Sequence, residues 1–384
     1  MFELNRIGLV HIELTNKCNA ACPSCARNVF GKTIPWLVPR ELYLEDIKRI
    51  FTDSSFNKSY PTRVKYCGNY GDPCVSRDII EIVQWFKQTD KLNMREQIIN
   101  TNGGMKNREF WKNLALEFKK EDNCGYVTFS IDGLEDTNHL YRKNVKWEKV
   151  WENLNTFVEN GGNATWEFLV FGHNKHQVEE ARKIAESLGV HFDPKRPLGF
   201  DTSGQLNSIA SIPTYDRHGR YEYSLVSENS EINGVYIDES RIGERHTPPD
   251  KPYKREFLAT DAEKEYAKNT TINCKSICGT YEKSHNFYLT SSGHILPCCF
   301  MHGSLESSAY NYSSHQLQNA VNLEDFNTAT KSVDEILTSD QMFDTFFKNM
   351  NSKTLEDGKL LFCADHCGEG VPMDLLYKER DINE

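Results

Sequence analysis

Short apolar runs and amphipathic helical runs alternate along the first half of the chain. Six runs have the alternating or continuous apolar pattern that is typical of β-strands: Ile7–Leu14, Arg63–Cys67, Gln97–Thr101, Tyr126–Ile131, Thr165–Phe171 and Val190–Phe192. Between them, apolar residues recur at helical spacing, for example at Ile79, Ile82, Val83 and Phe86. Strands that alternate with helices predict an α/β fold with a parallel sheet, either open or barrel-like.

The alternation of strand and helix patterns ends at about residue 200. Residues 201–270 are polar and rich in Ser, Asp, Glu and Arg. Within them, the segments Tyr221–Val226 and Gly234–Ile237 are expected to pair as a hairpin. We interpret residues 201–270 as a connector, or as an insertion that covers a substrate site.

A second, small α+β domain is expected in residues 271–384, after a first domain of residues 1–200. His285–Leu289 and His294–Leu296 predict a hairpin, since a Ser-Ser-Gly turn separates them. A helix is expected near Val333–Phe347.

Charge and composition narrow the classes of partner. Lys and Arg number 45 against 55 Asp and Glu, which gives a formal net charge of −10. No basic run interleaved with aromatic residues stands out, so neither nucleic acid nor a membrane is expected as a partner. The N-terminus lacks the basic head and apolar core of a signal peptide, and no stretch reaches the roughly 18 apolar residues of a membrane helix. We therefore expect a cytoplasmic protein that acts on a small molecule or a peptide.

The placement of the cysteines points to metal chemistry. The chain has 12 cysteines, and because the cytosol keeps thiols reduced, we expect metal binding rather than disulfides. Nine of them fall in three groups, at positions 18/22/25, 274/278/298/299 and 363/367. The remaining Cys67, Cys74 and Cys124 are expected to be small buried apolar side chains.

Cys18, Cys22 and Cys25 form a C-x3-C-x2-C pattern directly after the first predicted strand. Reactive groups gather at the carboxyl ends of parallel strands, so this loop is placed for chemistry. A 4Fe–4S cluster that is held by three thiolates leaves one iron free to bind an outside ligand. A zinc site is the alternative, but structural zinc takes four ligands, and the nearby His11 is expected to pack on the strand.

This cysteine loop, after the first strand of a β/α repeat, resembles that of the radical S-adenosylmethionine (SAM) superfamily, and the resemblance extends over residues 7–193. It implies a partial (β/α)6 barrel. It also implies that a 4Fe–4S cluster on Cys18, Cys22 and Cys25 binds SAM and cleaves it reductively to a 5′-deoxyadenosyl radical, which abstracts a hydrogen atom from a substrate. The expected electron source is a reductant such as flavodoxin or ferredoxin.

The segment Tyr70-Gly71-Asp72-Pro73 resembles the Gly-Gly-Glu-Pro segment of the same superfamily. The resemblance implies that Tyr70, Gly71 and Asp72 approach the amino group of SAM. Asp72 stands where Glu is usual, so the acidic charge is kept with a shorter reach. Alone, Gly-Asp-Pro would be read as an ordinary turn.

Two more motif residues are implied by resemblance to the branch that includes the anaerobic sulfatase-maturating enzymes. Its Ser-x-Asp-Gly…Arg run is similar to Ser130–Gly133 followed by Arg142, which implies that Ser130 contacts the ribose and Arg142 the methionine carboxylate. Asn102 is a weaker candidate SAM contact, because Asn-Gly is also a common turn. Ser24 stands where the superfamily usually has an aromatic residue, so the adenine contact is expected elsewhere, in Phe168–Phe171.

The later cysteines resemble the SPASM and twitch domains, which are auxiliary-cluster modules of the superfamily. A C-x9–15-G-x4-C pattern ends at Cys298 with Gly293 inside it, and a later cysteine pair can close the site. The implied type is the shorter twitch domain, with one auxiliary 4Fe–4S cluster. Cys274 and Cys299 are the expected substitutes among its ligands, and a four-cysteine zinc site is the alternative that spacing leaves open. The ligands that the pattern favours are Cys278, Cys298, Cys363 and Cys367.

Together, these resemblances imply an oxidoreductase. The auxiliary cluster is expected to take an electron from the substrate radical while a base takes a proton, so that a small molecule is oxidised. A small molecule is favoured over a peptide because no peptide-recognition segment precedes the first strand. Oxidation or cross-linking of peptide side chains is one alternative, and a non-catalytic zinc or iron–sulfur scaffold is another. The candidate bases, none of which stands out, are Glu167, His173, Asp193, Lys195 and Arg196.

Overall fold

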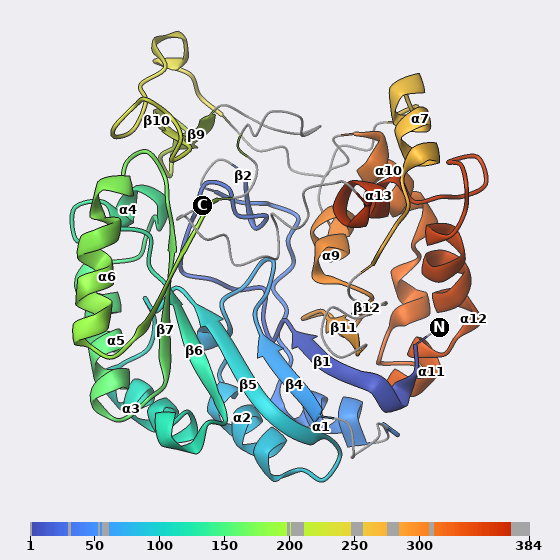
Figure 1. The fold of residues 1–384 in the computed structure, drawn as a ribbon, viewed down its shortest axis with the longest axis horizontal. Helices are drawn as coiled ribbons and strands as arrows, with labels where there is room; N and C mark the ends of the chain where they lie inside the picture. The colour runs from blue at the N-terminus through green and yellow to red at the C-terminus, as the bar shows by residue number, and fades with distance from the viewer. Residues whose placement is uncertain are drawn as a thin grey trace.

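One eight-stranded sheet forms the centre of the protein, as a computed structural model shows (Figure 1). The structure describes residues 2–29, 32–52, 54–55, 61–197, 200, 211–246, 256–274, 284–306 and 311–369. The strand order is β12-β11-β1-β4-β5-β6-β7-β8, and every neighbouring pair is parallel except β11 and β12. The strands are β1 (Ile7–Ile12), β4 (Pro61–Tyr66), β5 (Asn93–Thr101), β6 (Gly125–Ser130), β7 (Ala164–Leu169), β8 (His191–Lys195), β11 (His285–Leu289) and β12 (Ile295–Leu296).

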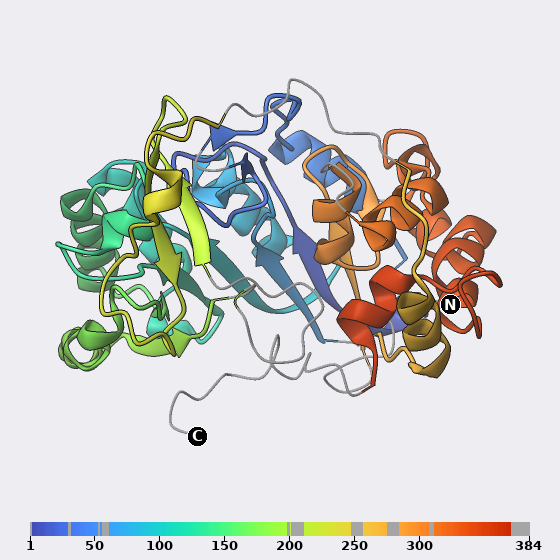
Figure 2. The same cartoon turned by 90° about the horizontal axis from the view of Figure 1, so that it is seen from above.

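The six strands predicted in the first half of the chain correspond to β1 and β4–β8. The predicted α/β class is confirmed, and the mainly parallel sheet is consistent with a partial barrel. Helices lie outside the curve of the sheet (Figures 1 and 2). Their apolar faces pack on it; in α2, for example, Ile79, Ile82, Val83 and Phe86 are fully buried. These helices are α1 (Leu44–Thr52), α2 (Ile79–Gln88), α3 (Arg108–Glu117), α4 (Asn138–Tyr141), α5 (Trp147–Glu159) and α6 (Val178–Ser187).

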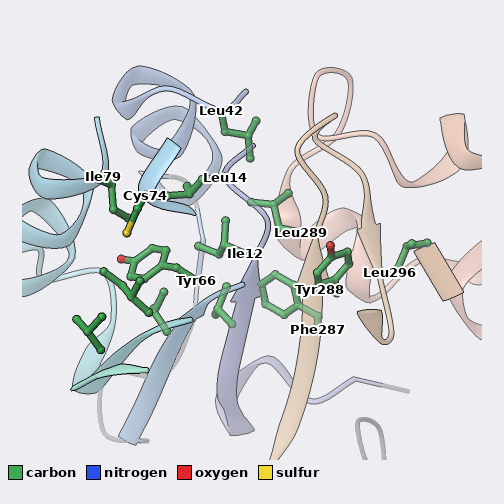
Figure 3. Packing of buried hydrophobic residues seen from close by; sticks show 14 of the residues in the cluster. Ile12, Leu14, Leu42, Tyr66, Cys74, Ile79, Phe287, Tyr288, Leu289 and Leu296 are labelled. Carbon is green, nitrogen blue, oxygen red and sulfur yellow. The ribbon is translucent and has the colours of Figure 1, made fainter. Parts of the chain in front are cut away.

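The predicted C-terminal hairpin is present as β11 and β12, and it extends the main sheet. β11 pairs in parallel with β1, with Ile12 opposite Leu289. Figure 3 shows Phe287, Tyr288 and Leu289 beside Ile12 and Leu14 in one hydrophobic cluster. The first and the last parts of the chain therefore share a sheet and a core, while the boundaries of the three expected parts stay a prediction.

The predicted hairpin of Tyr221–Val226 with Gly234–Ile237 is wrong, because Tyr221–Val226 pairs mainly with another strand. The strand is there as β10 (Tyr221–Val226), but it pairs with β9 (Ser211–Tyr215) in an antiparallel hairpin. Only Tyr236 of the expected partner bridges to it, through Ser224. The reason is a turn at Asp216, whose carboxylate accepts hydrogen bonds from the backbone N–H groups of His218 and Arg220.

The predicted helix near Val333–Phe347 is broken into three pieces. They are α11 (Val333–Leu337), α12 (Asp340–Met342) and a π-helical segment, Phe343–Lys348. Ser339 adopts an extended backbone and caps the second piece by accepting a hydrogen bond from the Met342 N–H, so it starts a new helix. The remaining elements are β2 (Asn28–Val29), β3 (Lys32–Thr33), α7 (Asp261–Asn269), α9 (Cys299–Glu306), α10 (Tyr312–Ala320) and α13 (Leu361–Cys367).

Among the described helices, none combines the length and the apolar composition that crossing a bilayer requires.

We predict that Leu114→Ala destabilises the fold by about 2–5 kcal/mol, because Leu114 is fully buried and truncation leaves a cavity. Leu116 lies on the same helix, α3, but is 50% exposed, so Leu116→Ala should cost no more than about 0.5 kcal/mol. Urea denaturation of both variants checks this. Equal midpoints for the two variants would contradict the burial pattern of α3.

Candidate active site

The three predicted cluster ligands lie in one loop that follows β1. The Cys25 N–H donates to the Cys22 carbonyl at 3.2 Å, which closes a tight turn between them. Donors from other segments point at two of the sulfur atoms. Asn102 Nδ2 is 3.6 Å from Cys18 Sγ, and Arg142 Nη1 is 3.9 Å from Cys22 Sγ. Such donors stabilise thiolates, and they come from residues that the sequence predicted near SAM.

Burial raises the pKa of all three thiols, that of Cys22 to about 12, although the charge of Arg142 opposes the rise there. Without a metal the thiols would therefore stay protonated, and metal binding would release their protons. Within the described ranges, no group of three or more His, Cys, Asp or Glu side chains is arranged to hold a single metal ion. Three cysteines are enough to hold a 4Fe–4S cluster with one iron left open, whereas a structural zinc site needs four ligands.

Gly71 packs the predicted SAM segment tightly on the cysteine loop. A Cβ at this position would lie 1.7 Å from the carbonyl oxygen of Thr15, so no other residue fits without a backbone shift. The next residue, Asp72, donates its N–H to the Lys17 carbonyl at 3.0 Å. Residues 70–72 are thus fixed against the segment that leads into Cys18.

The Asp72 carboxylate is buried and is held by protein donors. Thr101 Oγ1 lies 2.8 and 3.0 Å from the two carboxylate oxygens, to which it donates. The backbone N–H groups of Asn102 and Cys74 also donate to this carboxylate, at 2.7 and 2.9 Å. Asp72 therefore ties the loop after β4 to the end of β5. Little acceptor capacity is left for the amino group of SAM, so that contact stays a prediction.

Arg142 and Asp132 form a buried ion pair beside Cys22. Arg142 Nε is 2.5 Å from Asp132 Oδ2, and the other carboxylate oxygen accepts the Leu169 N–H at 2.6 Å. Burial alone would disfavour both charges, and the close pairing keeps the pKa of Arg142 well above its usual value. Ser130 lies at the end of β6, two residues before Asp132. Asp132 is a residue that sequence reasoning missed, although its place in the Ser-x-Asp-Gly motif was the available signal.

Glu13 is a second residue that sequence reasoning missed. Its carboxylate is fully buried and accepts hydrogen bonds from the Tyr70 N–H at 2.9 Å and from Ser291 Oγ at 3.0 Å. His302 Nδ1 lies 3.6 Å from the same carboxylate. Glu13 thereby connects β1, the predicted SAM segment, the β11–β12 turn and α9. The available signal was an acidic residue at the end of an otherwise apolar strand.

A cavity of about 310 Å³ lies between the sheet and the C-terminal helices. Its walls include β1, β4, β11, α9 and α13, and they carry six cysteines, Cys67, Cys274, Cys298, Cys299, Cys363 and Cys367. The structure thus brings together three of the four predicted auxiliary ligands, while Cys278 lies outside the described residues. Burial raises the pKa of the thiols of Cys298 and Cys363, and the proximity of Cys274 raises both further.

The three cysteines that were expected to be buried apolar side chains differ from one another. Cys74 is fully buried in the main core, as expected. Cys124 is half-buried, and its thiol donates to the Glu117 carbonyl at 3.3 Å. Cys67 instead lines the cavity, because it follows β4 on the same face as Lys65.

The candidate bases are mostly engaged in ion pairs. Lys195 Nζ lies 2.7 Å from Glu167 Oε2 and 2.8 Å from Asp193 Oδ2, and Arg196 Nε lies 3.0 Å from Glu228. His173 is buried, with its ring stacked on Phe171 at 5.3 Å. None of the five residues stands out as a base from this geometry.

The predicted adenine contacts are covered by other rings. Phe168 points to the opposite face of β7 from Glu167 and packs on Phe192 at 5.8 Å. Phe171 is fully buried against Tyr141 at 4.7 Å. Ser24 donates to or accepts from the Tyr141 hydroxyl at 2.8 Å. The adenine site therefore stays unassigned.

Comparisons with known proteins agree with the motifs. The family model described as the Radical SAM superfamily matches residues 12–188. The Fe-coproporphyrin III synthase of Methanosarcina barkeri (strain Fusaro) is 26% identical over 196 residues, which cover 50% of this chain and 44% of that protein. The 7,8-dihydro-6-hydroxymethylpterin dimethyltransferase of Methanocaldococcus jannaschii is 27% identical over 222 residues, which cover 54% of this chain and 40% of that protein. The similarity thus spans less than half the length of these curated relatives.

A solved structure resembles the fold over most of the chain. The crystal structure of Streptococcus suis SuiB bound to S-adenosylmethionine has a TM-score of 0.50 and 14% identity, and the likeness covers 94% of this chain and 72% of that one. At this level of identity the likeness concerns the fold alone.

We predict that His11 makes the fold sensitive to acid. Its Nε2 lies 2.7 Å from the Cys67 carbonyl, and burial together with the charge of Lys65 lowers its pKa to about 3. Because the unfolded chain takes up this proton near pH 6.5, stability is full above that pH and is lost as the pH falls toward 3. Between pH 7.5 and pH 5.0 the wild type should lose up to about 2 kcal/mol more than His11→Gln, which keeps an N–H donor.

Urea denaturation without oxygen at the two pH values checks this prediction. His218→Gln is the matched control, because His218 is exposed. An acid sensitivity that is the same in His11→Gln and the wild type would contradict the assignment.

Proposed function

Residues 12–188 of this chain belong to the radical SAM superfamily, and from this premise we propose that the protein reductively cleaves SAM and abstracts a hydrogen atom from a substrate. The observation that carries the proposal is the convergence of donors on the cysteine loop. Asn102 and Arg142, both motif residues, point at Cys18 and Cys22. When bound, the cluster supplies the electron that breaks the carbon–sulfur bond of SAM.

The chain's own residues would hold and shield the reactants. Cys18, Cys22 and Cys25 would bind three irons, so that one iron is left for SAM. The backbone of Tyr70 and Gly71, fixed by Glu13 and by the close contact with Thr15, would form a rigid wall beside that iron. Ser130 and Arg142 would contact SAM through a hydroxyl and a guanidinium, of which the latter is already oriented by Asp132.

We further propose an auxiliary 4Fe–4S cluster of twitch type in the cysteine cavity. Cys298, Cys363 and Cys367 line this cavity, and Cys274 or Cys278 would supply the fourth thiolate. The burial of Cys274 and Cys363 and the apolar neighbours Phe287 and Phe362 suit a cluster that is shielded from water. The cavity adjoins the cysteine loop, since Asn69 lines it and also accepts the Cys25 thiol at 3.7 Å through its carbonyl.

With two clusters, the reaction that fits best is a two-electron oxidation. The 5′-deoxyadenosyl radical would take one hydrogen atom from the substrate. The substrate radical would then pass one electron to the auxiliary cluster and one proton to a base, which leaves an oxidised product. A small molecule is favoured as substrate, because the curated relatives are named for a porphyrin and a pterin.

We predict that anaerobically reconstituted protein holds about eight irons and eight sulfides and, with SAM and a reductant, releases 5′-deoxyadenosine. Replacing Cys18, Cys22 and Cys25 together by Ala should abolish SAM cleavage and leave about four irons. Iron and sulfide assays and chromatography of the products measure both. Zinc without sulfide, or no cleavage of SAM by the wild type, would overturn the proposal and favour a non-catalytic metal-binding protein instead.

We predict the opposite pattern for the auxiliary site. Cys363→Ala with Cys367→Ala should lose about four irons but still release 5′-deoxyadenosine. Cys124→Ala is the matched control, because Cys124 lines neither site, and it should keep the full iron content. A Cys363/Cys367 variant that retains all its iron would remove these residues from the ligand set.

A further inference from the structure

Lys65 is the charged residue in the wall of the cysteine cavity. The residues of the described chain that line this cavity include no Asp, Glu or Arg and no other Lys. The side chain of Lys65 makes no hydrogen bond and no ion pair with a residue that the structure describes. By contrast, Lys195 on the same face of the sheet is paired with both Glu167 and Asp193. The ammonium group of Lys65 is thus left to act on whatever fills the cavity.

The position of Lys65 places its charge among the thiols. It stands opposite His11 in the register of β1 and β4 and two residues before Cys67. Lys65 lines the same cavity as Cys67, Cys298 and Cys299, so its side chain belongs to the wall that carries these thiols. His11, which faces Lys65 across the two strands, does not share this role, because burial lowers its pKa to about 3 and keeps its ring neutral.

A cluster that is held by four thiolates is an anion, and it becomes more negative when it accepts an electron. A fixed positive charge in a low-dielectric wall therefore favours the reduced state and raises the reduction potential. Lys65 belongs to β4 and so to the half of the chain that carries the SAM motifs. The loop after the same strand brings Asn69 to both cysteine sets, since Asn69 Nδ2 donates to the Cys299 carbonyl and its own carbonyl accepts the Cys25 thiol.

We propose that Lys65 tunes the auxiliary cluster, raising its reduction potential so that it accepts the electron of the substrate radical. This inference rests on the proposed auxiliary cluster. Lys65 would act through the cluster and not on the substrate, so it is a positioning residue. Its effect would be measured as a change in the reduction potential of the auxiliary cluster. The electron balance is that of the proposed oxidation, in which the substrate radical loses one electron and the cluster gains it.

The test is a redox titration of the full-length reconstituted protein, followed by electron paramagnetic resonance. The auxiliary signal is assigned in the variant that lacks Cys18, Cys22 and Cys25. Lys65→Met should make reduction of this cluster at least tenfold less favourable, a shift of about 59 mV to more negative potential for one electron. Lys65→Arg keeps the charge and should restore the wild-type potential. Iron content that matches the wild type shows that the fold and both clusters are intact.

Arg63→Met is the matched control. Arg63 precedes Lys65 by two residues on β4, on the same face, but does not line the cavity. Its replacement should leave the potential unchanged. Two results would overturn the inference: an unchanged potential in Lys65→Met, or an equal shift in Arg63→Met. Should Lys65→Met not fold, Lys65→Gln replaces it with the same expected direction. A wild type without a second cluster would instead overturn the auxiliary site itself, which iron counting distinguishes.

Discussion

The buried carboxylate of Glu13 is the interaction on which the arrangement of both cysteine sets depends. It lies just past the end of β1, and its two oxygens accept from the Tyr70 N–H and from Ser291 Oγ, with His302 close by. Leaving a buried polar group without its hydrogen-bond partner typically costs about 1–3 kcal/mol, and more where the group is charged. The contact holds the predicted SAM segment against the cysteine loop, and the same carboxylate holds α9, which starts at Cys299. Glu13 thus contacts segments of both predicted metal sites, next to the strand pairing of β1 with β11.

Around the cysteine loop, the buried polar groups hold neighbouring side chains and backbone segments in fixed positions. The Asp72 carboxylate accepts hydrogen bonds from Thr101, Asn102 and Cys74, and Asp132 fixes the guanidinium of Arg142. Gly71 allows a backbone approach that any side chain would block. These contacts leave Asn102 Nδ2 and Arg142 Nη1 aimed at sulfur. Charge-assisted donors of this kind stabilise thiolates that burial alone would keep protonated.

The features that could be predicted from the sequence are those that depend on local pattern: strands, helices and the spacing of cysteines. Periodicity located the six strands that the first half contributes to the main sheet and the helices α1, α2, α3, α5 and α6, and cysteine spacing located the loop after β1. It missed the short strands β2 and β3 and the helix α4. It could not predict the roles of Glu13 or Cys67, because each arises from contacts between segments that are far apart in the chain, whereas the place of Asp132 in the Ser-x-Asp-Gly motif was an unused signal. The partner of β10 was missed for a local reason, since the turn at Asp216 was not recognised. The assignment of the auxiliary ligands rests on spacing, and Cys278 lies outside the described residues.

The position of β11 in the main sheet would keep the proposed auxiliary cluster, as an electron acceptor, at a fixed distance from the Cys18–Cys25 loop. A C-terminal cluster domain that was joined only by a linker could drift relative to the radical site. Here β11 is hydrogen-bonded to β1, so that Tyr288 lies opposite His11 while Lys65 lies opposite the same residue from β4. The walls of the cysteine cavity therefore come from three adjacent strands of one sheet, of which two belong to the first half of the chain. Register then fixes the distance between the cavity and the Cys18–Cys25 loop, and a charge on β4 would act on the proposed auxiliary cluster, whose proposed ligands lie in the C-terminal segment.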